Sequence, residues 1–154
     1  IKKWLESEGF KALIVGERPI ITVPVGDLAP PSLYKVPDLV AISDLDPLRN
    51  SALIVEVESH QKKFLEALGK CVLWKTMAKL VYLAYPGGIR PKPEILERYG
   101  IGLLAVSEES VEEQIRILPK EGRIPFKVTE LHPLDDPRQT ELVNQIRRQL
   151  RTLA

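Results

Sequence analysis

Short apolar runs alternate along this chain with longer segments in which apolar residues recur every three or four positions. The apolar runs lie at 12–15, 20–25, 39–42, 52–55, 80–84 and 101–106, and each has the pattern of a strand. A succession of strand, helix, strand, helix and strand from 52 to 106 implies parallel crossovers. The pattern therefore predicts an α/β fold.

Helical spacing is most regular over 61–78, where the apolar positions are Phe64, Ala67, Leu68, Cys71, Trp74 and Ala78. Shorter helices are expected over 1–9 and 91–99, stopped by Gly9 and Gly100. Asp136-Pro137 is a good helix start, and an apolar stripe follows it at Leu142, Ile146, Leu150 and Leu153. We expect this stripe to be buried, either on the sheet of its own chain or across a homodimer.

Two further stretches complete the secondary-structure prediction. The segment 107–114 is acidic and is typical of a solvated turn or a helix start. The runs at 115–118 and 124–128 are consistent with an edge hairpin, and 26–36 is expected to be a loop.

Length and charge limit the class of protein. A chain of 154 residues is long enough for one domain with a single core. Its formal net charge of +1 provides no global attraction to nucleic acid or membrane, so nucleic-acid binding would need a local patch. No apolar run approaches the roughly 20 residues that span a bilayer, and no signal-peptide pattern opens the chain. We expect a soluble cytoplasmic protein.

Two smaller features of the sequence also carry expectations. The chain begins with Ile1 rather than Met, which indicates a trimmed product or a domain cut from a longer protein, and a missing segment before it would be able to hold further site residues. The single cysteine, Cys71, is expected to be a small buried hydrophobe. Thirteen prolines and many charged residues would suit a thermophile.

Three acidic residues stand out at the strand ends. Glu56 and Glu58 follow the run 52–55 directly, and side chains two positions apart on a strand share a face. Asp38 opens the preceding strand and joins them if the two strands pair. Three converging carboxylates would suit a hard cation such as Mg²⁺. A solvated strand end explains the same spacing equally well.

The ordered set of motifs resembles the PD-(D/E)XK nuclease superfamily. It consists of Pro37-Asp38, then Glu56-Val57-Glu58-Ser59, then a helix and the strand at 80–86, and finally Gly100-Ile101-Gly102-Leu103-Leu104. The resemblance implies a restriction-endonuclease-like core over 1–107, with a mixed central sheet flanked by helices, and a C-terminal helical extension over 108–154. It also implies phosphodiester cleavage, with Mg²⁺ or Mn²⁺ held by Asp38, Glu56 and the Val57 carbonyl.

The chain departs from the family at its lysine, because Glu58 occupies that position. Glu58 would accept a proton from the attacking water or bind a second metal. Lys70 is the candidate substitute, since helix spacing places it at the border of the buried face, where it would balance charge on the phosphate. Alternatively, Lys70 pairs only with Glu66 one turn earlier.

Nucleic acid is the partner that this resemblance implies, DNA rather than RNA. The segment 62–79 holds five lysines against one glutamate, and Lys62, Lys63 and Lys75 are the expected phosphate contacts. His60 is either a base or a solvent-facing turn residue. Two functions remain open: a metal-dependent DNA nuclease, and a catalytically degenerate relative that acts as a nucleic-acid-binding or assembly module.

Overall fold

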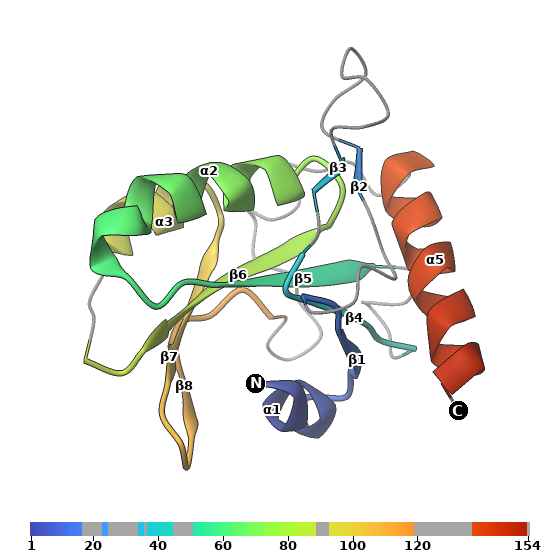
Figure 1. Ribbon diagram of the computed structural model, residues 1–154, viewed down its shortest axis with the longest axis horizontal. Helices are drawn as coiled ribbons and strands as arrows, with labels where there is room; N and C mark the ends of the chain where they lie inside the picture. Colours follow the sequence, from blue (N-terminus) through green and yellow to red (C-terminus); the bar gives the residue numbers. More distant parts are fainter. Residues whose placement is uncertain are drawn as a thin grey trace.

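A six-stranded sheet forms the centre of the protein (Figure 1). The computed structural model describes residues 1–16, 23–24, 34–35, 37–44, 51–88, 93–118 and 137–153. In spatial order the strands are β1 (Lys11–Ile14), β4 (Leu39–Ile42), β5 (Ala52–Val57), β6 (Leu80–Pro86), β7 (Gly102–Val106) and β8 (Val111–Ile115). Two short strands, β2 (Val23–Pro24) and β3 (Tyr34–Lys35), pair separately from this sheet.

The sheet is mixed, as the resemblance implied. Strands β5, β6 and β7 are parallel, whereas the β1–β4, β4–β5 and β7–β8 pairs are antiparallel. Parallel neighbours need crossover connections, and these are α2 (Phe64–Trp74), preceded by the 3₁₀ turn η1 (Gln61–Lys63), and α3 (Pro93–Arg98). The predicted α/β class with a mixed sheet flanked by helices is therefore confirmed.

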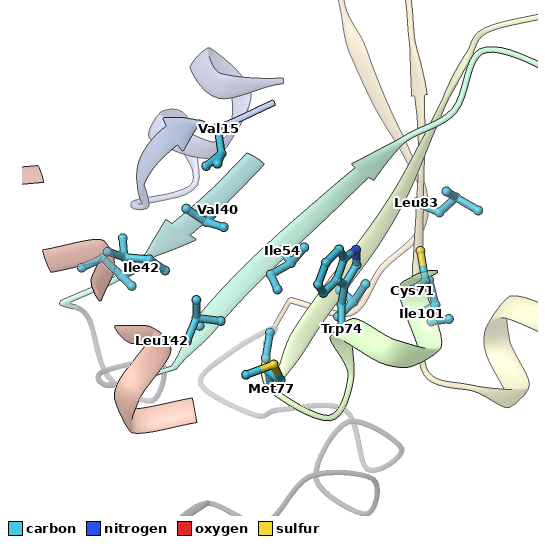
Figure 2. Close-up of a cluster of buried hydrophobic side chains, with 14 of the residues drawn as sticks. Val15, Val40, Ile42, Ile54, Cys71, Trp74, Met77, Leu83, Ile101 and Leu142 are labelled. Atoms are coloured by element: carbon cyan, nitrogen blue, oxygen red, sulfur yellow. The ribbon is translucent and has the colours of Figure 1, made fainter. Parts of the chain in front are cut away.

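Helices cover both faces of the sheet. On one face, called the α2 face below, side chains of α2, α3 and α5 (Pro137–Leu153) pack against alternate residues of the strands. Figure 2 shows Ile54, Cys71 and Trp74 among the buried side chains of this face. On the opposite face, α1 (Lys2–Ser7) contributes Leu5 to a second apolar cluster. The prediction that Cys71 is a buried hydrophobe is confirmed, and burial raises the pKa of its thiol.

Helix α5 docks on the sheet of its own chain. Leu142 and Ile146 are buried and Leu150 is partly buried against the same cluster, whereas Leu153 is 66% exposed. Helix α5 contacts β1, β4 and β5. Burial of the stripe on the chain's own sheet is thus confirmed for its first three members and wrong for Leu153. In the described part of the chain, no helix is long and apolar enough to cross a membrane.

Two glycines end helices as predicted. Gly9 and Gly100 have φ values of 89° and 66°, in the left-handed region that glycine adopts without steric strain. Gly102 is needed for a different reason, because a Cβ atom there would lie 2.4 Å from the Tyr82 ring. The start of β7 therefore approaches β6 more closely than a side chain would allow.

Strand β8 corrects the prediction for 107–114. Its residues alternate between half-buried and exposed. Val111 and Glu113 are half-buried on the side of Tyr82, whereas a register shift in the β7–β8 pairing puts the half-buried Ile115 on the α2 face. Glu113 is satisfied there, since it accepts hydrogen bonds from the Tyr82 hydroxyl at 3.1 Å and from Arg116 at 2.9 Å. The acidic residues concealed a period-two strand pattern.

Other boundaries also differ from the prediction. Helix α2 ends at Trp74 rather than at Ala78, and a turn follows it. Tyr34–Lys35 is a strand within the predicted loop 26–36, most of which lies outside the described residues. The strand predicted at 124–128 lies outside them, so the predicted hairpin is not tested, and 115–118 holds the last residue of β8 and the segment after it.

Candidate functional site

Asp38 and Glu56 lie beside each other where β4 begins and β5 ends. In the β4–β5 register Leu39 pairs with Val55, so the next position pairs Asp38 with Glu56. Both follow the alternation of the α2 face, to which Val40 and Ile54 also belong. The Asp38 carbonyl accepts a hydrogen bond from the Val15 N–H at 2.8 Å, which anchors this end of β4 to the chain after β1.

The Pro37-Asp38 dipeptide also changes how β5 ends. The Val57 N–H donates to the Asp38 side chain, with 2.8 Å between the nitrogen and Oδ2. The same register would place Pro37 opposite Val57. Proline has no N–H, so this position supplies no ladder donor to the Val57 carbonyl. Strand pairing thus stops at the acidic pair, where a backbone oxygen and two carboxylates lie together.

Glu56 is buried, with 4% of its surface exposed, and a donor faces each of its oxygens. The Trp74 indole N–H donates to Oε2 at 2.9 Å, and the Lys70 ammonium lies 3.4 Å from Oε1. Burial raises the pKa of Glu56, the Trp74 hydrogen bond lowers it, Asp38 raises it and Lys70 lowers it. The net shift is upward, so the Glu56 carboxyl group loses its proton at a higher pH than an exposed glutamate does.

Lys70 faces Glu56 from helix α2, as predicted from helix spacing. Its Nζ is 3.4 Å from Glu56 Oε1 and 3.9 Å from Glu66 Oε1. Lys70 therefore contacts both glutamates and does not pair with Glu66 only. Burial by itself lowers the pKa of Lys70, but the carboxylates of Glu56, Glu66 and Asp38 raise it, and the net shift is upward. The side chain therefore remains an ammonium beside the acidic pair.

Glu58 does not join the other two acids in this structure. Its Oε1 accepts the backbone N–H of His60 at 2.9 Å, which closes the turn between β5 and η1. Among the described residues, no three His, Cys, Asp or Glu side chains are grouped so that they could hold one metal ion. The predicted convergence of Asp38, Glu56 and Glu58 is therefore wrong here, because a local backbone hydrogen bond competes for Glu58. His60 itself is exposed.

The predicted nucleic-acid contacts divide into two groups. Lys62 and Lys63 are exposed in η1, near the acidic pair in the sequence. Lys75 and Lys79 are buried, and the Lys75 ammonium donates to the Lys79 carbonyl at 3.1 Å. Burial and the neighbouring Lys79 lower the pKa of Lys75 to about 8. The structure thus contradicts the prediction for Lys75, because the chain turns inward once α2 ends at Trp74.

Two residues of the site were not predicted from the sequence. Trp74 holds Glu56, and its position four residues after Lys70 on the buried face was the available signal. Tyr85 belongs to the α2 face and is 1% exposed, and its hydroxyl has no hydrogen-bond partner among the residues that the structure describes. No sequence signal identified it, because only the β5–β6 register places it near the acids.

The donor atoms fit a hard divalent cation. Asp38 and Glu56 offer carboxylate oxygens and Val57 offers a carbonyl, which are the ligands that Mg²⁺ and Mn²⁺ prefer. Each carboxylate oxygen that already accepts one hydrogen bond keeps a second lone pair. Lys70 provides a positive charge 3.4 Å from Glu56 Oε1. By their chemistry, the residues present therefore fit such a cation.

Comparisons with known proteins extend the description of the fold. No family model matches the sequence, and no curated protein shows significant similarity to it. Among solved structures, the chain is similar to the SPO1766 protein of unknown function from Silicibacter pomeroyi, with a TM-score of 0.51 and 17% sequence identity. The match covers 97% of this chain and 82% of that one. The similarity concerns the fold alone.

Proposed function

We propose that this protein is a metal-dependent nuclease that hydrolyses phosphodiester bonds in DNA, with a PD-(D/E)XK type of site. The observation that carries the proposal is the contact between Lys70 and Glu56, 3.4 Å apart beside Asp38 at the end of the β4–β5 pair. Asp38 and Glu56 with an adjoining ammonium, at a strand end where pairing stops, are part of the set that we expected from the sequence; Glu58 is the member that lies apart.

Asp38, Glu56 and the Val57 carbonyl would hold the cation. Bound Mg²⁺ or Mn²⁺ would polarise the scissile phosphate and lower the pKa of a bound water. The burial of Glu56 supports this role, because a cation and a carboxylate attract each other more strongly in a partly desolvated site than in water. Trp74 fixes the orientation of the Glu56 carboxylate through its indole N–H.

Lys70 would take the role of the motif lysine, whose position Glu58 occupies in this chain. Its side chain is 35% exposed, so Lys70 borders both the buried Glu56 and the solvent from which a phosphate would arrive. Negative charge that builds up on the phosphate in the transition state would be stabilised by this fixed cation. Lys62 and Lys63, exposed in η1, would contact neighbouring backbone phosphates.

Glu58 supports the second candidate, a degenerate relative that binds nucleic acid or assembles with partners without cutting. It stands where the motif has lysine, and its carboxylate is engaged by the His60 N–H. In the nuclease, Glu58 would accept the proton of the attacking water or bind a second metal. The two candidates differ in one measurable property, which is metal-dependent cleavage.

The test is a cleavage time course on plasmid, single-stranded DNA and RNA with Mg²⁺, Mn²⁺ or chelator. We expect cleavage that requires the metal, and we expect Glu56→Gln to lower its rate by about 10²-fold or more, because the substitution removes a charge from the metal site. Glu66→Gln is the matched control: the same chemical change at the exposed second partner of Lys70 should leave the rate nearly unchanged. Wild-type protein that cuts none of these substrates would favour the binding module instead.

A further inference from the structure

The Tyr85 hydroxyl is a polar group in the interior of the protein. Its side chain is 1% exposed, and the structure gives the hydroxyl no hydrogen-bond partner among the described residues. Buried hydroxyl groups nearly always have a partner, because losing water without replacing its hydrogen bond is unfavourable. An unsatisfied hydroxyl at this end of the sheet therefore points to a partner that arrives when the site is in use.

The strand register identifies that partner. Val57 of β5 pairs with Ala84 of β6, and the Glu58 N–H continues the ladder to the Ala84 carbonyl at 3.0 Å. Glu58 therefore lies opposite Tyr85. Tyr85 belongs to the α2 face, and alternation along β5 puts Glu58 on the same side as Glu56. Across the two strands, the carboxylate nearest in register to the phenol is that of Glu58.

Glu58 is close to Tyr85 without bonding to it. Burial, followed by the charges of Glu58 and Cys71, raises the pKa of Tyr85 to about 12, so the carboxylate acts on the phenol through space. The same carboxylate accepts the His60 N–H at 2.9 Å. A glutamate side chain has three rotatable bonds, so Glu58 is able to exchange one donor for the other by changing its rotamer.

We propose that Tyr85 is a positioning residue for Glu58: when a divalent cation binds at Asp38 and Glu56, the Glu58 carboxylate leaves the His60 N–H and accepts the Tyr85 hydroxyl. Glu58 already lies on the α2 side of β5, so only its carboxylate moves, and it becomes the third acid of the site. The inference rests on the proposed function, since it requires a cation at the acid pair.

The energetic argument is a population shift. Without a cation, three neighbouring carboxylates repel one another, and Glu58 is more stable at the turn. A cation interacts more favourably with three acids than with two, so it shifts the equilibrium toward the gathered arrangement. The Tyr85 hydroxyl adds to that shift, because it gains a hydrogen bond only when Glu58 moves.

The experiment measures Mn²⁺ affinity by calorimetry for the wild type and for Tyr85→Phe, Glu58→Gln and the double variant. We expect Tyr85→Phe to weaken Mn²⁺ binding by about tenfold, the scale of one hydrogen bond to a charged group. The melting temperature without metal should stay the same or rise, because no described residue forms a hydrogen bond with the hydroxyl that is removed. Tyr99→Phe, at an exposed tyrosine, is the matched control and should change neither quantity.

The double variant decides whether Tyr85 acts through Glu58. If it does, the double variant binds Mn²⁺ about as weakly as Glu58→Gln alone. Additive losses, or Tyr85→Phe binding as tightly as the wild type, would overturn the positioning role and leave the proposed nuclease site standing. A wild-type protein that binds no Mn²⁺ would overturn both, so the two failures are distinguishable.

Discussion

Replacing Lys70 by alanine should lower metal-dependent DNA cleavage by about 10²-fold or more, the scale for losing one preorganised charge-stabilising group. Asp38, Glu56 and the phosphate place several negative charges together, and one divalent cation offsets only part of them. Lys70 is the ammonium that contacts Glu56, at 3.4 Å. The substitution should leave folding intact, because the side chain is partly exposed at the border of the core.

The pH profile gives a second readout for Lys70. Since Lys70 lowers the pKa of Glu56, its removal raises that pKa, and the acid limb of the rate profile should move to higher pH. Lys63→Ala is the matched control, because Lys63 is an exposed lysine in the preceding turn η1. This substitution should affect substrate binding more than the rate of cleavage. Equal cleavage by wild type and Lys70→Ala would show that the ammonium is only structural.

The largest loss of stability is expected where α5 docks on the sheet. Ile146 is fully buried against the cluster of the α2 face, and Ile146→Ala would remove its packing and leave a cavity. We expect the free energy of unfolding to fall by about 2–5 kcal/mol. The matched control is Leu153→Ala in the same helix, at a residue 66% exposed, which should change it by about 0.5 kcal/mol or less. Urea unfolding curves measure both, and equal losses would mean that α5 is not held as described.

The sequence was sufficient for the class of fold because its strongest signals were local. The apolar runs of β5, β6 and β7 and the helices between them dictate a parallel core without knowledge of contacts. Strand β8 escaped prediction because Glu112 and Glu113 hide the alternation, and the hydrogen bond that keeps Glu113 at the inward side comes from Tyr82, 31 residues away. Long-range partners of this kind are not visible in a local pattern.

In the candidate site, too, local patterns predicted some residues correctly and failed for others. Strand alternation and helix spacing were enough to bring Asp38, Glu56 and Lys70 together. Spacing failed for Glu58, because a hydrogen bond to the His60 N–H decides where that side chain lies. It failed for Lys75 because the length of α2 determines whether that lysine faces solvent or the interior.

The most direct test of the central claim is a crystal structure of the protein grown with Mn²⁺, with anomalous scattering used to locate the ion. We predict one anomalous peak between the carboxylates of Asp38 and Glu56, next to the Val57 carbonyl and with the Lys70 ammonium still facing Glu56. Well-ordered side chains at saturating Mn²⁺ with no peak between the two carboxylates would contradict a metal-dependent site at this end of the sheet.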